Sequence, residues 1–416
     1  MKPQLSAPGG NILSTWPLGE LGEYTIISGT SMATPFVAAC YALVKSQFPT
    51  LSIAEIRAKL QSTSMPVAYL PDKSILSTAI HQGAGLVNPY QAIHFESSIF
   101  PSELSLGDSD SFSKYASNIT ITNRSDRSKT YVIDHSGAGY AERFPYPDLL
   151  LPRDRFKFGQ PQYAKYASAA FSQSSVLVPA GKSATIQIQI TPPANIDSAK
   201  NPIFSGFITV TNNNDKFVVP YAGVPYFRHD VDYFGNCIGD PPCFNTFKSR
   251  ALFNNNGTFA GFDINLNTGL GIYNASDYFD SPDVDLFVLH FSKRVRVDVL
   301  PANTTFIPDI YGFDPTQKFE YQASPSPLKS SFLDEKTYGQ VPWESYIDAL
   351  PDSHWWSWSN LEVQTDQDKV PPFLGGFKKV GLGDYRLLAS VLRWGGDPLE
   401  RESWQTFLTP ILRFVS

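Results

Sequence analysis

Three features that would define a class of protein are missing from this sequence of 416 residues. No run of lysines and arginines stands out and the formal net charge is −6, which argues against nucleic-acid binding. No uninterrupted stretch of about eighteen apolar residues occurs, so we expect no transmembrane helix. The N-terminal MKPQLSAPGG has no apolar segment of the kind found in a signal peptide. Either the protein is not exported or its true start lies upstream.

Cysteine is equally scarce, with three residues in the whole chain. Cys40 lies inside an apolar run, which predicts a buried free thiol. Cys237 and Cys243 flank a tight turn in NCIGDPPC, a spacing that favours a short disulfide. Such a disulfide would stabilise the fold by about 2 kcal/mol if it acts by restricting the unfolded chain. The alternative is two unpaired thiols in a loop.

Glycosylation motifs are present in modest excess. Chance predicts about three N-x-S/T sequons from this content of Asn, Ser and Thr, and the sequence holds more, which weakly favours a secreted glycoprotein. The candidate acceptor residues are Asn118, Asn123, Asn256, Asn274 and Asn303.

The composition is that of a globular protein with sizeable cores, since 42% of the residues are hydrophobic and 17% are charged. With 33 prolines, 28 glycines and 14% aromatics, strands and turns are favoured over long helices. The pattern changes near residue 98. Before it, Gly29–Val44 carries no charge, which predicts a helix buried on every side. Ser52-Ile-Ala-Glu55 is a capping box that begins a second helix.

Beyond residue 98, apolar and polar residues alternate as in strands with one face in water. The segment TIQIQI at 185–190 is the clearest case. Turn-forming clusters such as 212–215 separate the strands. Many short strands punctuated in this way predict β-sandwiches, with Val224-Pro225 as a joint between two of them. The other expected strands span 118–122, 206–211, 217–221, 284–289, 295–300 and 385–392.

The strongest candidate for chemistry is Ser31, in the heptapeptide GTSMATP at 29–35. Gly29 allows a tight turn into the helix, which places the serine hydroxyl at an exposed helix start. There the Ser31 N–H has no intrahelical partner and lies in the positive end of the helix dipole. A nucleophile beside an oxyanion donor is what acyl transfer requires. On these grounds alone, a serine that merely begins a buried helix is the commoner interpretation.

GTSMATP closely resembles the nucleophile segment of the subtilisin-like proteases, the subtilases. The resemblance extends upstream to KPQLSAPGG and downstream through the helix AEIRAKL to GAGLVNPYQAI, so it covers about residues 1–95 in the family's order and spacing. It implies that Ser31 is the nucleophile and supplies one oxyanion N–H. Gln4 stands where the family usually has an acid, and Phe36 where many members carry a non-catalytic histidine. Neither departure touches the chemistry directly.

The same resemblance implies a multidomain fold, in which the C-terminal remnant of an α/β subtilisin-like domain is followed by all-β sandwich domains. We expect the remnant at 1–98, a domain similar to fibronectin type III at 99–225 and a second β-sandwich at 226–416. The middle assignment depends on position, strand pattern and the segment GKSATIQI. In the family, such domains brace the catalytic domain or govern access of the substrate.

The residues that would activate Ser31 are not found before it. In subtilases the aspartate and the histidine of the triad precede the serine, yet residues 1–30 contain neither residue type. Asn11 is too close to Ser31 in sequence to match the asparagine of the second oxyanion donor. His135, beside Asp134, is the nearest to a substitute, although a turn histidine is the more economical interpretation. The other histidines are His81, His94, His229, His290 and His354.

Two features of the β region invite a binding role. The segment HWWSW contains three tryptophans, and indole rings can stack on sugars. The favoured interpretation is that alternate tryptophans face a core. The three tryptophans are Trp355, Trp356 and Trp358. Five aspartates could hold calcium, but their spacing matches no EF-hand loop and we expect no metal. They are Asp232, Asp277, Asp280, Asp283 and Asp285.

Two hypotheses follow. The first is an extracellular serine endopeptidase that cleaves proteins or peptides through an acyl-enzyme and needs no cofactor. Because no base precedes Ser31, we expect this chain to be an inactive fragment alone, with the N-terminal protease part encoded upstream or supplied by a separate chain. The apolar helix after Ser31 would then lose part of its cover. The alternative is a non-catalytic β-sandwich module that retains a protease remnant and works by adhesion or partner binding. The aromatic, sequon-bearing tail resembles that of large extracellular fungal proteases.

Overall fold

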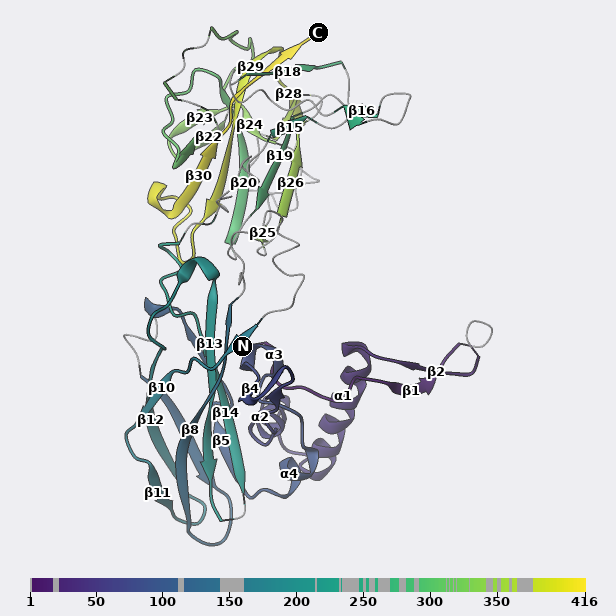
Figure 1. Cartoon of the computed structure of the whole chain (residues 1–416), viewed down its shortest axis with the longest axis vertical. Helices are drawn as coiled ribbons and strands as arrows, with labels where there is room; N and C mark the ends of the chain where they lie inside the picture. The colour runs from purple at the N-terminus through teal and green to yellow at the C-terminus, as the bar shows by residue number, and fades with distance from the viewer. Residues whose placement is uncertain are drawn as a thin grey trace. The chain divides into compact units, whose positions relative to one another are not determined.

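The computed structural model of the chain consists of two compact units, with a boundary between Phe227 and Arg228 (Figure 1). The structure describes residues 2–17, 22–110, 116–142, 161–213, 215–231, 233, 247–249, 252–253, 259–260, 270–276, 282–287, 292–311, 313, 315–316, 318, 320–328, 330–341, 347–349, 353–358, 361–364 and 377–416.

The first unit begins with a small helical part whose core lies between α1, α2 and α4 and includes Cys40, Val44 and Leu60. The capping box predicted at the start of α2 is confirmed: Ser52 Oγ accepts the Glu55 N–H at 3.3 Å, and Glu55 Oε2 accepts the Ser52 N–H at 2.9 Å. The elements are β1 (Ile12–Thr15), β2 (Tyr24–Ile27), α1 (Thr30–Gln47), α2 (Ile53–Ser62), β3 (Ala68–Tyr69), β4 (Asp72–Leu76), α3 (Ala79–Gln82) and α4 (Pro89–His94).

The rest of the first unit is a β-sandwich. One sheet has the strand order β10-β12-β7-β5, and the other has the order β11-β8-β13-β14-β6 with β9 paired to β8. The predicted alternation at 185–190 is confirmed, because Ile186, Ile188 and Ile190 are buried and the residues between them are exposed. Both sheets contribute to one core, as Ile121 and Phe204 illustrate. The elements are β5 (Ser97–Phe100), β6 (Leu104–Gly107), β7 (Ser117–Asn123), β8 (Lys129–Glu142), β9 (Gln162–Tyr163), β10 (Ser168–Phe171), β11 (Ser175–Val178), β12 (Ser183–Thr191), a 3-10 turn (Ser198–Lys200), β13 (Pro202–Thr211) and β14 (Lys216–Gly223).

A buried polar junction joins the helical part to the sandwich. Ser205 on β13 shares a 2.9 Å hydrogen bond with the hydroxyl of Thr78, and Gln162 Oε1 accepts the Thr78 N–H at 2.7 Å. On α2, the Gln61 amide donates to the Glu103 carboxylate at 2.7 Å. Buried hydrogen bonds of this kind require fixed geometry on both sides. The helical part and the sandwich therefore pack as one unit, and the expected boundary at residue 98 falls inside it.

The second unit is centred on a large sheet with the strand order β18-β31-β29-β20-β24-β27-β28, to which β21, β25 and β30 attach. Trp358 lies in its core with 1% of its surface exposed. Its ring packs edge-on against Tyr385 and Phe414, at centroid distances of 5.1 and 4.9 Å, and its N–H donates to the Glu362 carbonyl. One member of HWWSW therefore faces a core, as favoured above.

The elements of the second unit are β15 (Phe247–Ser249), β16 (Leu252–Phe253), β17 (Phe259–Ala260), β18 (Leu270–Asn274), β19 (Pro282–Phe287), β20 (Ser292–Pro301), β21 (Ile310–Tyr311), β22 (Ser330–Phe332), β23 (Glu335–Thr337), β24 (Gly339–Gln340), β25 (Ile347–Ala349), β26 (Ser353–Ser357), β27 (Glu362–Gln364), β28 (Phe377–Lys379), β29 (Gly383–Leu392), a 3-10 turn (Arg401–Ser403), β30 (Trp404–Leu408) and β31 (Ile411–Val415).

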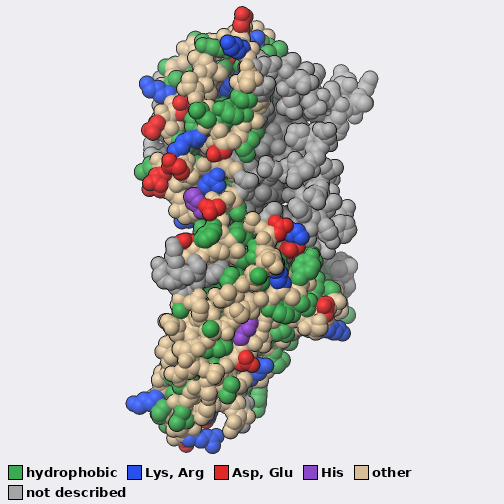
Figure 2. Space-filling model, turned by 60° about the vertical axis from the view of Figure 1, so that its left-hand side comes forward, with side chains coloured by type: hydrophobic (Ala, Val, Ile, Leu, Met, Phe, Trp, Pro, Cys, Tyr) green, Lys and Arg blue, Asp and Glu red, His purple; other side chains and the backbone are tan. Residues whose placement is uncertain are grey.

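Charged side chains of both signs are spread over the visible surface, and Figure 2 shows Lys and Arg scattered among Asp and Glu on that face. In the part of the chain that the structure describes, no helix has the length and apolar character needed to cross a membrane.

Strand β20 is buried on both faces. One face contributes valines, including Val297, to the apolar core. The other carries Arg296 and Asp298, whose side chains are 4% and 0% exposed. Two hydrogen bonds of 2.7 and 2.6 Å join the guanidinium to the carboxylate, and the ring of Phe332 lies 3.8 Å from the guanidinium carbon. Each charge in this pair is compensated mainly by the other.

We expect Asp298→Ala to lower hydrogen-exchange protection of the β20 and β29 amides by about 150- to 5,000-fold. Removing one partner of a buried pair costs about 3–5 kcal/mol, because the other charge stays buried without compensation. The double variant Arg296→Met with Asp298→Leu should stay close to wild-type protection, since replacing both charges with apolar groups is nearly neutral. Equal protection in the single variant and the wild type would contradict this account of the pair.

Candidate active site

Ser31 is the second residue of α1 and is exposed to solvent. Gly29 precedes the helix in an extended conformation, and no side chain caps the helix start. Among the described residues, neither the hydroxyl nor the backbone N–H of Ser31 has a hydrogen-bond partner. The expected pairing of an accessible serine hydroxyl with a free N–H at a helix start is therefore present.

Three separated segments are joined in series by backbone hydrogen bonds, and one of them begins α1. The Gly29 N–H donates to the Gly9 carbonyl at 2.8 Å, and a Cβ on Gly9 would lie 2.7 Å from the Gly29 oxygen. The first segment is held in turn by the third: the Ser6 N–H donates to Gly85 at 2.8 Å, and Ala84 donates to Gln4 at 2.9 Å. These segments are the ones that carry the resemblance drawn from the sequence, so the matched motifs form one contiguous structure.

Glycine is required in the third of these segments. Gly83 and Gly85 have φ angles of +63° and +107°, which side chains rarely adopt. A Cβ at these positions would lie 2.3 Å from the Gln4 backbone and 2.1 Å from the Met65 carbonyl oxygen. Gly83 thus allows the close approach of the N-terminal segment, and Gly85 allows that of the backbone at Met65.

The histidines with described side chains are engaged elsewhere. His135 lies on β8, where its Nε2 is 2.7 Å from the Tyr221 hydroxyl. Burial lowers the pKa of His135, with Asp134 acting in the opposite direction. His81 contacts Gln162, and the rings of His94 and Tyr90 lie 4.2 Å apart. In the second unit, His229 contacts Asp230, His354 lies on β26 and His290 is outside the described residues. Among the described residues, no histidine is hydrogen-bonded to Ser31.

The prediction that the helix after Ser31 is buried on every side is wrong. Only Cys40 and Val44 of α1 are buried, while the exposed fractions of Phe36 and Leu43 are 42% and 53%. The hairpin β1–β2 is similarly bare, with exposed Leu13, Tyr24 and Ile26. The cause is a lack of packing elements, because among the described elements only α2 and α4 make substantial contact with α1. An exposed apolar surface of this kind is typical of a site that packs against another structure.

The cysteine and sequon predictions have mixed outcomes. Cys40 is a buried free thiol, as predicted, and burial raises its pKa. Cys237 and Cys243 lie outside the described residues. Asn123 requires a correction, because its side chain is fully buried and donates to the carbonyls of Arg127 and Val178, so the folded domain cannot carry a glycan there. Exposed acceptors Asn118, Asn274 and Asn303 remain predictions, and Asn256 lies outside the described residues.

Other sequence expectations fall largely on undescribed residues. The side chains of Trp355, Trp356 and of the five candidate calcium-binding aspartates are not described. Within the described residues, no group of three or more His, Cys, Asp and Glu side chains could hold a metal ion. A different feature was missed from the sequence: Lys59 and Arg124 line one cavity although 65 positions separate them. No local pattern marks that pairing.

Comparisons with known proteins agree with the geometry. The model of the subtilase family matches residues 1–90, and that of an Fn3-like domain matches 104–227. The PII-type proteinase of Lactococcus lactis subsp. cremoris is 27% identical over 248 residues, which cover 53% of this chain and 12% of that protein. The minor extracellular protease Vpr of Bacillus subtilis is 32% identical over 148 residues, 33% of this chain and 18% of that one.

A plant relative gives the same picture over a shorter range. The subtilisin-like protease SBT4.15 of Arabidopsis thaliana is 39% identical over 104 residues, 23% of this chain and 13% of that protein. The chain thus spans between about one eighth and one fifth of the length of these curated relatives.

The neighbouring residues Leu43 and Val44 test whether α1 is covered on one side only. We expect Val44→Ala to lower the free energy of unfolding by about 2 kcal/mol, because it leaves a cavity beside Cys40 and Ile56. Leu43→Ala should change it by less than about 0.5 kcal/mol, since that side chain is half-exposed. Urea unfolding of the two variants measures the difference. Equal losses would mean that the face bearing Leu43 is covered in solution.

Proposed function

We propose that this chain, which belongs to the subtilase family and contains an Fn3-like domain, is part of an extracellular serine endopeptidase in which Ser31 is the nucleophile. The observation that carries the proposal is the exposed hydroxyl of Ser31 beside its own unpaired N–H at the start of α1. Extracellular action is supported by the relative described as an extracellular protease. Proteins or peptides are the proposed substrates.

In the proposed reaction the Ser31 oxygen attacks the carbonyl carbon of a peptide bond while a base takes the hydroxyl proton. The carbonyl oxygen becomes an oxyanion, to which the Ser31 N–H donates a hydrogen bond. Collapse of this intermediate expels the amine, which receives the proton, and leaves an acyl-serine that water hydrolyses to the acid. Each step uses side-chain and backbone groups, so no cofactor is required.

We further propose that residues 1–416 alone do not turn over peptides, because the base is not among them. In the family's chain order both triad partners precede the serine, and residues 1–30 contain no aspartate or histidine. Loss of the histidine alone lowers the turnover of subtilisin by about a million-fold. The uncovered faces of α1 and of β1–β2 support the same proposal, since they are surfaces that a complete domain would bury.

A fluorophosphonate probe tests the inactivity directly. We expect no labelling of Ser31 in the purified chain, because the hydroxyl has no base to remove its proton. Intact-mass spectrometry after incubation, with active subtilisin as the positive control, measures the outcome. Stoichiometric labelling that Ser31→Ala abolishes would overturn the claim that this chain alone is inactive.

A chimera tests the nucleophile. The part of Bacillus subtilis Vpr that precedes the matched region would be joined to this chain at the start of that region. Vpr then supplies the segments in which the family's aspartate and histidine are expected. We expect the chimera to hydrolyse casein, Ser31→Ala to abolish hydrolysis and Ser28→Ala to retain it. Ser28 is the matched control because it is an exposed serine three positions away whose hydroxyl contacts Asn11. A folded chimera that gives equal activity with and without Ser31 would refute its proposed role.

A further inference from the structure

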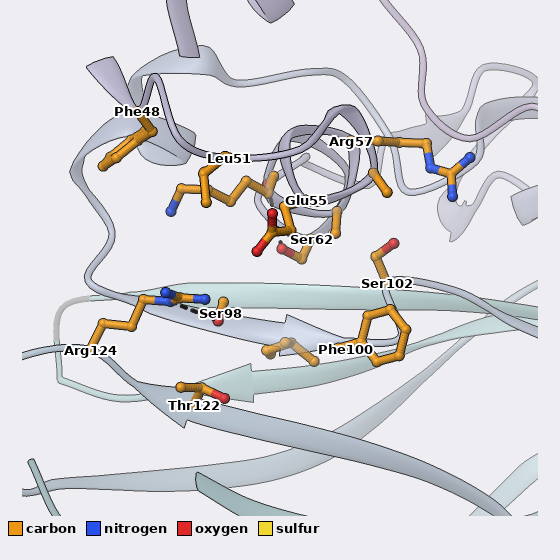
Figure 3. Close-up of a pocket in the computed structure, with 14 residues that line it drawn as sticks. Phe48, Leu51, Glu55, Arg57, Ser62, Ser98, Phe100, Ser102, Thr122 and Arg124 are labelled. Carbon is orange, nitrogen blue, oxygen red and sulfur yellow. Dashed lines mark hydrogen bonds between the residues drawn. The ribbon is translucent and has the colours of Figure 1, made fainter. Parts of the chain in front are cut away.

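A cavity of about 330 Å³ lies between α2 and the sandwich edge at β5 (Figure 3). It is separate from the candidate active site, because Phe48 on its wall follows the C-terminal end of α1 and Ser31 lies near the other end. A helix of that length holds the two about 25 Å apart. The volume falls at the lower end of the range of small-molecule sites. A ligand there would not meet the nucleophile.

The wall of this cavity combines an apolar surface with hydroxyl groups. Phe48, Leu51 and Ile99 are among the apolar residues, and Ser98 and Thr122 are among the hydroxyl-bearing ones. In Figure 3 the side chains of Phe48 and Phe100 lie near opposite ends of the site, with Ser98 and Arg124 on the strand side. A ligand that fits this wall has an apolar body and a polar group that accepts hydrogen bonds.

Basic side chains outnumber acidic ones in the lining, with Arg57, Lys59 and Arg124 against Glu55. The Glu55 carboxylate is held by the capping box, where Oε2 accepts from both the N–H and the hydroxyl of Ser52. In the described part of the chain, no ion pair joins Lys59 or Arg124 to a carboxylate. The three basic side chains and the one acidic side chain leave the lining with a net charge of about +2, and Arg57 points away from Arg124 in Figure 3.

Lys59 is poorly compensated for a half-buried cation. Its Nζ has a long contact of 3.4 Å to the Phe95 carbonyl and lies 5.1 Å from the centre of the Phe48 ring. Burial lowers the pKa of Lys59, and the nearby Arg124 lowers it further. Arg124 Nε donates to Ser98 Oγ at 3.3 Å and leaves the rest of its guanidinium available. An anion placed at these two groups would gain charge-assisted hydrogen bonds and relieve their repulsion.

We propose that this cavity binds a carboxylate carried on an apolar group, with the carboxylate at Lys59 and Arg124. The apolar wall favours a singly charged carboxylate over a doubly charged phosphate, because the more highly charged group costs more free energy to remove from water. The apolar group lies along the aromatic and aliphatic wall. Two sources share this chemistry, namely an aliphatic acid and the C-terminal residue of a peptide. The proposal does not depend on proteolysis, since it uses no atom of Ser31.

Calorimetric titration of the full chain with two probes tests the proposal. Octanoate represents the aliphatic acid, and acetyl-phenylalanyl-leucine with a free C-terminus represents the peptide. We expect at least one probe to bind, and its uncharged analogue, octanol or the peptide amide, to bind at least about tenfold more weakly, the loss expected for one charge-assisted hydrogen bond. The probe that binds more tightly identifies the source.

Three variants locate the binding. Arg124→Gln should weaken binding about tenfold. Ala54→Trp should also weaken it, because Ala54 lines the cavity at an exposed position of α2 and a larger side chain would occupy the space. Arg127→Gln is the matched control, an exposed arginine on the same turn that does not line the cavity, and it should bind like the wild type.

Several outcomes would overturn the proposal. The uncharged analogue binding as tightly as the acid would exclude the role of the carboxylate. Unchanged affinity in both Arg124→Gln and Ala54→Trp would place the ligand elsewhere on the chain. Dissociation constants weaker than about 5 mM for both probes would show that the cavity does not select such a ligand.

Discussion

Backbone hydrogen bonds among three short segments hold the start of α1, and the geometry of the candidate nucleophile depends on them. Gly29 donates to Gly9, and the N-terminal segment is fixed by its bonds to Gly83–Val87. Gly83, with its positive φ angle, allows the close approach of Gln4. The motifs matched to the subtilase family are therefore not independent signals. They are the parts of one packing unit.

Much of the local structure could be predicted because it depends on neighbours in sequence. The capping box at Ser52, the alternation in β12 and the helix start at Ser31 are set by a few adjacent residues. The burial of α1 could not be predicted, because an apolar sequence shows that a helix can be buried but not which elements are present to pack against it. The residues described here cover only the side bearing Cys40 and Val44. An apolar helix sequence thus indicates that the helix is more stable when buried, and the other elements of the chain determine how much of it is buried.

Polar contacts between segments far apart in the sequence could not be predicted either. Thr78 and Ser205 are 127 positions apart, and Gln61 is 42 positions from Glu103, so no periodicity connects either pair. The buried Arg296–Asp298 pair contradicts the simple expectation that both faces of a central strand are apolar. In the first unit these contacts have a structural consequence. The Fn3-like sandwich is joined to the helical part by buried hydrogen bonds that require fixed positions of both partners. The sandwich therefore supports α2 and α3, and α2 in turn packs against α1.

The exposed face of α1 and the hydroxyl of Ser31 share one feature, since neither is covered by another element among the described residues. A serine hydroxyl needs a base held within hydrogen-bond distance, and such a base must come from an element that packs near the helix start. The exposed Leu13 and Ile26 of the preceding hairpin and the exposed Phe36 of the helix need apolar partners in the same neighbourhood. An additional layer of structure packed on α1 and the hairpin could supply both the apolar partners and the base. On the proposal that Ser31 is the nucleophile, apolar cover of α1 and activation of the hydroxyl are therefore expected to appear together.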